Sequence, residues 1–398
     1  MSSDRSVLKL FLFAFFGWTF DFYDLALLGF IRESVTNDLG ISHDAEPWLL
    51  GTALCTSGLG GIVAGALADR FGKRTMLTAT ILTYSLGSLV SGAATNVAMF
   101  IVGRGIVGLG VGGEWAIGHG MVAEAVRPEM RGRASALLQS GEPVGVALAA
   151  IAGYLVAPHV GWRWVLVGSS ATALIALVAR TSLHIPNEPA PPRPSLAVLR
   201  DAKIGSRMAR AWLLGVFKLG TYWSVYIWLP GFLAKEMGQG IGKSLAWMVT
   251  AQLGQLVGML TFGWVSDRLG RRPAFAAYSL LTAAAIAPLA FAWQTLGAHP
   301  FAFWSVMLAL GLGSGCTAGF GALLAELYPT EVRGAAMGTT YNLARAVQVV
   351  APLAVSIALE RWGLAGALGV PLALAIATAS WVWTLPETRG IALPTASK

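Results

Sequence analysis

Twelve apolar runs of about 20 residues follow one another along the chain, and they constrain its fold more than any other feature. A helix needs about 20 mostly apolar residues to cross the hydrocarbon core of a bilayer. The sequence lacks the shorter alternating segments of a membrane β-barrel, so we predict an all-α membrane protein. The expected spans are Leu8–Ile31, Pro47–Leu67, Thr75–Ala94, Val97–Val126, Ala134–Pro158, Trp162–Leu183, Ala209–Leu233, Ser244–Val265, Pro273–Leu296, Pro300–Leu327, Ala335–Leu359 and Leu364–Leu385.

The charged residues are few and unevenly distributed. They make up 12% of the chain, against about 25% in soluble domains, which excludes a soluble enzyme. With the N-terminus in the cytoplasm, 20 of the 28 Lys and Arg residues fall on the cytoplasmic side, as the positive-inside rule requires. We therefore expect a multi-pass protein of the inner (plasma) membrane with both termini cytoplasmic. This distribution explains the net charge of +8 without nucleic acid, and we expect no cofactor and a monomer.

The two halves of the sequence repeat each other. The loop Gly65–Arg74 recurs as Gly263–Arg272, and Ala123–Gly132 recurs as Ala325–Gly334, at nearly the same offset. A proline-rich stretch lies between the halves. We predict twelve transmembrane helices in two pseudo-symmetric six-helix bundles: an N-terminal bundle of residues 1–183, a cytoplasmic linker of residues 184–208 and a C-terminal bundle of residues 209–398. Parallel repeats of this kind are typical of a transporter whose site lies between the halves near mid-membrane.

At these residues the chain resembles the major facilitator superfamily. The G-x-x-x-D-R-x-G-[RK]-R loop occurs twice, Arg104–Gly108 resembles the family's second motif, and Pro386–Gly390 is similar to the ending of sugar porters. Other segments resemble the organic-acid:proton symporter branches, which include lactate and sialate carriers. They are Gly112–Trp115, Gln139–Gly145 and Tyr341–Arg345. The resemblance implies the major facilitator fold and secondary transport.

The paired loops predict a gate at the cytoplasmic face. Asp69 can accept hydrogen bonds from a helix N-terminus, and Arg127 or Arg131 can pair with it. Such contacts can hold one face closed and release when the halves rock. Charges that only set the orientation in the membrane are the alternative. We assign to the gate Asp69, Arg70, Arg131, Asp267, Arg268 and Arg333.

Several carboxylates lie deep inside the predicted spans, where they are costly and usually line a cavity or a proton path. Asp21 and Asp24 share one face of the first span, and Asp24 lies at a depth similar to that of Arg104. By resemblance to proton-coupled sugar porters, Asp24 and Arg104 are a coupling pair; a purely structural pair is the alternative. Glu142 is a further proton-site candidate, or else a partner for a buried cation. We rank Glu114 below the two aspartates.

His119 also lies in the inner part of the fourth span, and we expect it to be a packing residue.

Two cations also lie deep inside the predicted spans, and a buried cation needs an anion. Lys218 and Arg345 are neutralised either by internal carboxylates or by an anionic substrate, and an Arg fork matches a carboxylate in bidentate fashion. Asn342 lies three residues before Arg345 on the same span and could supply a polar contact. Gln139 matches a substrate-contacting glutamine of the sugar porters. An aromatic stripe one turn beyond Lys218 either packs the core or walls the substrate; it comprises Tyr222, Trp223 and Tyr226.

We predict a secondary transporter, not an enzyme, because no nucleophile–base pair or metal cluster is present in the sequence. The leading hypothesis is proton-coupled symport of a small organic anion by alternating access. The anion would be a monocarboxylate such as lactate or pyruvate, or an aromatic acid. A proton-coupled porter of a neutral sugar or polyol, and a drug exporter, are the alternatives.

Overall fold

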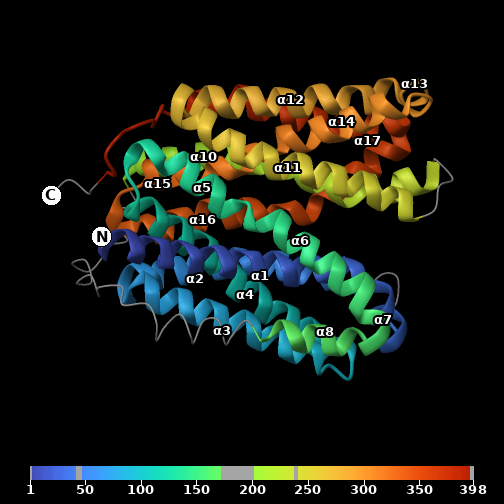
Figure 1. Cartoon of the computed structure of the whole chain (residues 1–398), viewed down its shortest axis with the longest axis horizontal. Coiled ribbons are helices and arrows are strands. Elements are labelled where there is room, and N and C mark those ends of the chain that lie inside the picture. The colour runs from blue at the N-terminus through green and yellow to red at the C-terminus, as the bar shows by residue number, and fades with distance from the viewer. Residues whose placement is uncertain (1, 42–46, 172–200, 237–240, 395–398) are drawn as a thin grey trace.

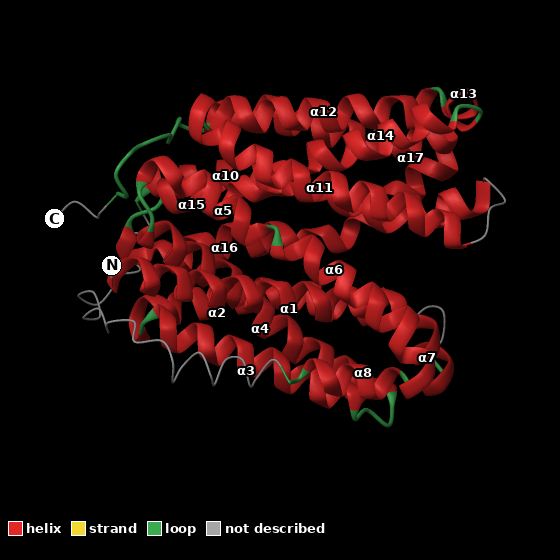
Figure 2. Ribbon diagram, in the orientation of Figure 1, coloured by secondary structure: helices red, strands yellow, loops and turns green. Residues whose placement is uncertain are grey.

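Helices form the whole framework of the protein. The computed structural model describes residues 2–41, 47–171, 201–236 and 241–394, and within these ranges every regular element is a helix (Figure 2). Seven helical stretches of this part are long and apolar enough to cross a membrane by length and composition. The prediction of an all-α membrane protein is confirmed.

The N-terminal half follows the expected spans closely. Its fifth span is interrupted after Gln139, where Pro143 lacks the N–H that would bond to the Gln139 carbonyl. Residues 172–183 of the sixth span lie outside the described ranges. The elements are α1 Ser2–Leu39, α2 Pro47–Phe71, α3 Lys73–Gly92, α4 Val97–Ala125, η1 Pro128–Met130, α5 Arg131–Gln139, α6 Gly141–Ile151, η2 Ala152–Val156, α7 Ala157–Val160 and α8 Trp162–Ser169.

The C-terminal half starts earlier than expected. The Asp201 carboxylate accepts hydrogen bonds from the backbone N–H groups of Lys203 and Ile204, so α10 begins at Ala202 and residues 202–208 of the expected linker are helical. Residues 184–200 of that linker lie outside the described ranges. Gly363, with φ of 63°, breaks α17 between the two last expected spans. The elements are α10 Ala202–Glu236, α11 Ile241–Leu269, α12 Arg271–Phe291, α13 Trp293–Gly297, α14 Pro300–Ser314, η4 Gly315–Ala318, α15 Gly319–Leu327, η5 Thr330–Val332, α16 Arg333–Ala346, η6 Val347–Val350, α17 Ala351–Trp381 and η7 Val382–Thr384.

The two halves lie side by side, with the start of α1 and the last described residues at the same end (Figure 1). We call this the motif end, because it carries Gly65–Arg74 and Gly263–Arg272. The C-terminal segment is anchored there, since the Pro394 carbonyl accepts from the Thr330 N–H (2.9 Å). Both chain ends thus lie on one side of the protein.

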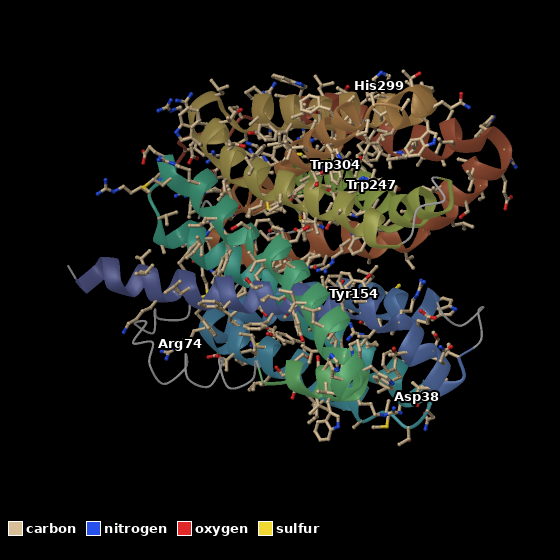
Figure 3. The ribbon with its side chains drawn as sticks, turned by 45° about the vertical axis from the view of Figure 1, so that its right-hand side comes forward. Asp38, Arg74, Tyr154, Trp247, His299 and Trp304 are labelled. Carbon is tan, nitrogen blue, oxygen red and sulfur yellow. The ribbon has the colours of Figure 1, made fainter. Side chains whose placement is uncertain are left out.

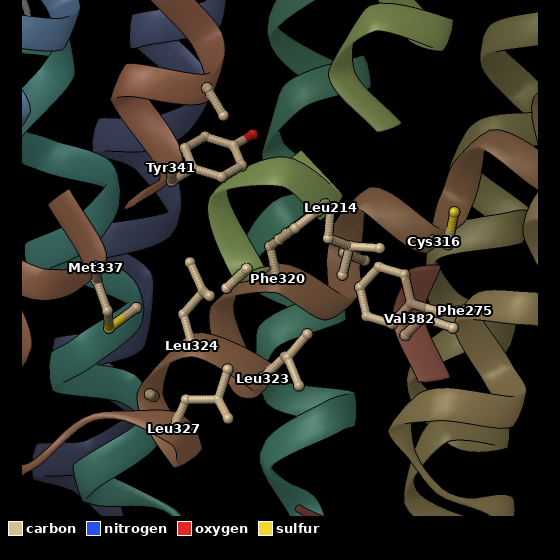
Figure 4. Packing of buried hydrophobic residues seen from close by; sticks show 14 of the residues in the cluster. Leu214, Phe275, Cys316, Phe320, Leu323, Leu324, Leu327, Met337, Tyr341 and Val382 are labelled. Carbon is tan, nitrogen blue, oxygen red and sulfur yellow. The ribbon is translucent and has the colours of Figure 1, made fainter. Parts of the chain in front are cut away.

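The largest buried cluster joins the halves. It contains Trp115 and Phe22 from the N-terminal half and Phe320 and Tyr341 from the C-terminal half. Figure 4 shows its C-terminal members, with Phe320 and Tyr341 projecting from α15 and α16. Van der Waals packing of these side chains against one another holds the two halves together.

The outer surfaces of both halves are apolar. Tyr154 and Trp304 are 43% and 37% exposed, and Figure 3 shows them on separate halves. Leu155 and Phe301 are exposed by 65% and 87%. In water such a surface would cause association, whereas lipid tails accommodate it.

Candidate functional site

Asp69 joins the halves at the motif end. It comes at the end of α2, and its carboxylate accepts hydrogen bonds from the backbone N–H groups of Gly334 (3.0 Å) and Ala335 (2.8 Å), at the start of α16. These N–H groups have no partner within their own helix, and the helix dipole favours a negative charge there. The expected helix N-terminus is therefore present, and it belongs to the other half.

Asp267 repeats this contact in the opposite direction. It ends α11 of the C-terminal half, and its carboxylate accepts from the N–H groups of Gly132 (2.9 Å) and Arg133 (3.0 Å) at the start of α5. The guanidinium groups of Arg271 (2.7 Å) and Arg133 (3.1 Å) also donate to this carboxylate. The sequence repeat thus corresponds to a pair of reciprocal contacts between the halves.

The arginines expected in the gate have different roles in the structure. Arg333 pairs with Glu124 of the other half, so it does contact across the interface. Arg131 donates to the carbonyls of Ala123 and Ile391 instead of pairing with Asp69. The reason is geometric, because Arg131 begins α5, whose N-terminus meets Asp267, whereas Asp69 meets the start of α16.

The motif arginines Arg70 and Arg268 remain on their own helices. Arg70 lies over the Phe71 ring (5.2 Å) and Arg268 over the Trp264 ring (3.8 Å). Among the described residues, neither arginine forms a hydrogen bond or an ion pair with the other half, although Arg268 lines a surface hollow together with Glu129 of that half.

A small cavity lies between the halves near the middle of the molecule. Its free volume is about 10 Å³, roughly what is needed to admit one water molecule, so its walls must part to admit an organic molecule. It is lined by Phe22, Glu142, Leu219, Tyr222, Trp223, Thr317, Tyr341 and Arg345.

Arg345 is the cation of this cavity. Its side chain is buried, and both terminal nitrogens lack a hydrogen-bond partner among the described residues. The Phe22 ring lies 5.5 Å from its Cζ, and no ion pair of 4.0 Å or less forms with a described carboxylate. The guanidinium fork is thus free to receive an anion.

Glu142 also faces the cavity, but it is fully engaged. Gln139 Nε2 donates to one of its oxygens (2.8 Å) and Gln255 Nε2, from the other half, donates to the second (3.1 Å). The Tyr222 hydroxyl lies within hydrogen-bonding reach. Glu142 therefore links the two halves, and Arg345 is its charged neighbour in the cavity without forming an ion pair with it.

Trp115 and His119 extend this network along α4. Both ring nitrogens lie 3.0 Å from Gln139 Oε1, and the Trp115 ring stacks on Tyr341 of the other half at 3.7 Å. Gln139 is thus held behind the cavity wall. The sequence reasoning missed Gln255, although the two glutamines Gln252 and Gln255 in the middle of an apolar span were a usable signal.

Asp24 and Arg104 form the expected pair. Arg104 Nη1 lies 2.6 Å from Asp24 Oδ1, and both side chains are buried. Ser88 and Ser169 also donate to the Asp24 carboxylate. The pair joins α1, α3, α4 and α8 and does not line the cavity.

Asp21 is not part of the Asp24–Arg104 pair. It is fully buried and lies beside Glu114 of α4, within hydrogen-bonding reach, with Arg345 and Asp24 as its charged neighbours. None of the four oxygens of Asp21 and Glu114 accepts a hydrogen bond from a described donor. Glu114, which sequence reasoning ranked low, thus belongs to the same group as Asp21.

Three expected substrate contacts lie away from the cavity. Asn342 donates to the carbonyls of Gly112 (2.7 Å) and Gly338 (3.2 Å), because α4 and α16 meet at this point. Tyr226 stacks on Tyr222 (4.5 Å). Lys218 is buried, and its Nζ has no hydrogen-bond partner in the described part of the chain.

The hydrogen bonds between the halves indicate a conformation. Along the length of the molecule, the hydrogen bonds between described residues of the two halves begin at the motif end and reach as far as Glu142 and Gln255. Beyond these two residues, no described residue forms such a bond. The halves are therefore closed at the motif end, and opening that end requires breaking the contacts of Asp69 and Asp267.

Comparison with known proteins agrees with this architecture. A relative from Haemophilus influenzae is 31% identical over 397 residues, covering 95% of each chain. The sialic acid transporter NanX of Escherichia coli is 29% identical over 389 residues, covering 96% of this chain and 93% of its own. The structure of the proton:xylose symporter XylE superposes with a TM-score of 0.79 over 98% of both chains at 19% identity, which shows a common fold.

The sequence matches the Major Facilitator Superfamily over residues 10–251 and 241–397. Together with the two bundles and the reciprocal loop contacts, this match identifies the chain as a transporter, not an enzyme, that belongs to the Major Facilitator Superfamily.

Proposed function

We propose that this protein is a proton-coupled symporter of a small organic anion, such as a monocarboxylate or an aromatic acid, and works by alternating access. The observation that carries the proposal is the Arg345 guanidinium, which is buried in the central cavity with both terminal nitrogens unpartnered. A carboxylate fits this fork in bidentate fashion. The similarity to a sialic acid transporter supports an acidic substrate.

The walls of the cavity suit a flat or short apolar acid. Phe22, Trp223 and Tyr341 supply aromatic surface around Arg345, while Tyr222 offers a hydroxyl next to Glu142. Ligand sites commonly combine such apolar walls with a few polar groups that fix orientation. Lys218, one turn before Tyr222 on α10, would add positive potential without direct contact.

Proton coupling is the second part of the proposal. Buried carboxylates next to the cavity, Asp21 above all, offer a place for a proton that moves with the anion. We place the protein in the inner membrane, with the motif end and both termini in the cytoplasm. There the membrane potential supplies about 2.3 kcal/mol per charge per 100 mV.

Counterflow in proteoliposomes with labelled lactate, pyruvate, benzoate and glucose tests the substrate class. Binding of an acid and its neutral amide, such as benzoate and benzamide, then tests Arg345. We expect wild type to prefer the acid, Arg345→Lys to weaken acid binding, and Arg345→Gln to abolish the preference while remaining monodisperse. If wild type binds acid and amide equally, or carries only glucose, Arg345 is an internal charge and the anion proposal is wrong.

A further inference from the structure

Asp21 and Glu114 form a facing pair of carboxyl groups that neither the gate nor the cavity wall explains. They come from α1 and α4, they are 0% and 1% exposed, and they lie within hydrogen-bonding reach of each other. Gly17, one turn before Asp21, makes the approach possible: a Cβ there would lie 1.8 Å from Glu114 Oε1. The glycine thus leaves the space that the Glu114 carboxyl fills.

This pair needs a proton to be stable. No described N–H or O–H group donates to any of its four oxygens, so each carboxyl meets only another acceptor unless one of them carries a proton. Two ionised carboxylates side by side in a dry interior repel each other and have lost their hydration. One shared proton turns the repulsion into a hydrogen bond. The pair therefore holds at least one proton and has room for a second.

The other buried carboxylates nearby differ in this respect. Asp24 accepts from Arg104 (2.6 Å), Ser88 and Ser169, and Glu142 accepts from Gln139 and Gln255. Donors of this kind stabilise the ionised form. The Asp21–Glu114 pair has no such donors among the described residues, so it is the group of carboxyls in which a proton has to supply the missing hydrogen bond.

Arg345 connects this pair to the anion site. Asp21 is faced by Glu114 from α4, by Arg345 from α16 and by Asp24 on its own helix. With one shared proton the pair has one negative charge, and Arg345 is its nearest unpaired cation. When an organic anion binds the Arg345 guanidinium, that single positive charge faces two negative charges, the anion and the carboxyl pair, and it cannot neutralise both. The pair then takes up its second proton.

We propose that the Asp21–Glu114 pair is the proton carrier of this transporter: it holds one proton when the cavity is empty and two when an organic anion occupies Arg345. The inference rests on the proposed anion site. The second proton enters from the same side as the anion and leaves with it, so a monoanion crosses without net charge. Linkage also makes the effect reciprocal, so that protonation tightens anion binding by the same factor.

The direct test is proton uptake during binding. Purified protein in weakly buffered detergent receives the acid that counterflow identifies, and a pH indicator reports protons taken up per acid bound. We expect about one proton for wild type, less than a third of that for Asp21→Asn or Glu114→Gln, and none for the double variant. Asp38→Asn, which changes an exposed carboxylate on the same helix, should match wild type.

Three further variants separate a carrier from a structural pair. Gly17→Ala keeps both carboxyls but pushes Glu114 away from Asp21, so it should lower proton uptake as Glu114→Gln does. Asp24→Asn should retain about one proton per acid bound. Where a neutralised variant is not monodisperse, Glu114→Asp keeps the charge and shortens the reach, and it should also lower the uptake.

The outcomes distinguish the two proposals. If wild type binds the acid but takes up no proton, or if Glu114→Gln keeps the full uptake, the carrier assignment is wrong while the anion site stands. If the loss follows Asp24→Asn instead, Asp24 is the carrier. If wild type binds no acid, the anion site is wrong and the carrier inference falls with it.

Discussion

Gly65→Ala should shift the protein away from the conformation that is closed at the motif end. Gly65 of α2 faces α16 of the other half, and a Cβ there would lie 2.3 Å from the Gly334 carbonyl oxygen. Ordinary contact begins at 3.4 Å, so the helices would have to separate by about 1 Å. Backbone on both sides of the contact leaves no flexible side chain to give way.

Two free-energy costs determine how far Gly65→Ala destabilises the conformation that is closed at the motif end. Overpacking of a close contact costs about 1–3 kcal/mol. Separation by about 1 Å also stretches the hydrogen bonds from Gly334 and Ala335 to Asp69, now 3.0 and 2.8 Å, and bonds to charged groups contribute about 1.5–3 kcal/mol each. Because partial relaxation reduces both, we expect about 2 kcal/mol in total, which corresponds to about a 30-fold change in the ratio of closed to open molecules.

A distance measurement across the motif end checks this. Spin labels at Phe71 and Leu269, which are 56% and 66% exposed at the ends of α2 and α11, should report a larger population of long distances in Gly65→Ala. The exposed Cys55 is replaced first. The matched control is Gly51→Ala on the same helix, whose Cβ would lie 3.4 Å from a side-chain carbon of the other half. An unchanged distribution in Gly65→Ala, or an equal shift in the control, would refute the reasoning.

Three other changes have definite expected results. Asp24→Asn leaves the buried Arg104 without a counter-charge and should cost about 3–5 kcal/mol, seen as a lower melting temperature in detergent; an unchanged melting temperature would contradict the ion pair's role. Asp69→Ala and Asp267→Ala each free two helix N-terminal N–H groups at the gate, so uptake kinetics should show slower turnover with substrate affinity within a few-fold. A large loss of affinity at unchanged rate would argue against a gate. Trp115→Ala removes a ring stacked across the halves and a donor to Gln139, and it should weaken acid binding in equilibrium measurements by about tenfold, or about 1.4 kcal/mol; wild-type affinity would place that ring outside the site.

The sequence by itself determined the membrane spans, the duplication and the type of residue at each key position. Hydropathy over about 20 residues is a local property, so the spans could be located without any knowledge of contacts. The repeat placed Asp69 and Asp267 at equivalent positions, and depth along the helices marked Asp24, Arg104 and Arg345 as buried charges. The break at Gly363 falls between the two last expected spans, whereas the break at Ser140 depends on short-range backbone geometry that no apolar run reveals.

The tertiary structure alone decided the partners. Asp69 is bound by N–H groups more than 260 positions away, and no local pattern indicates that they belong to the opposite half. The amide of Asn342 is the kind of group that binds a substrate, yet in the folded protein it donates to the Gly112 carbonyl of α4. Glu114 seemed secondary until packing placed it against Gly17 and beside Asp21. A buried polar group acquires its role from the donors that reach it, and those donors are set by how helices far apart in the chain pack together.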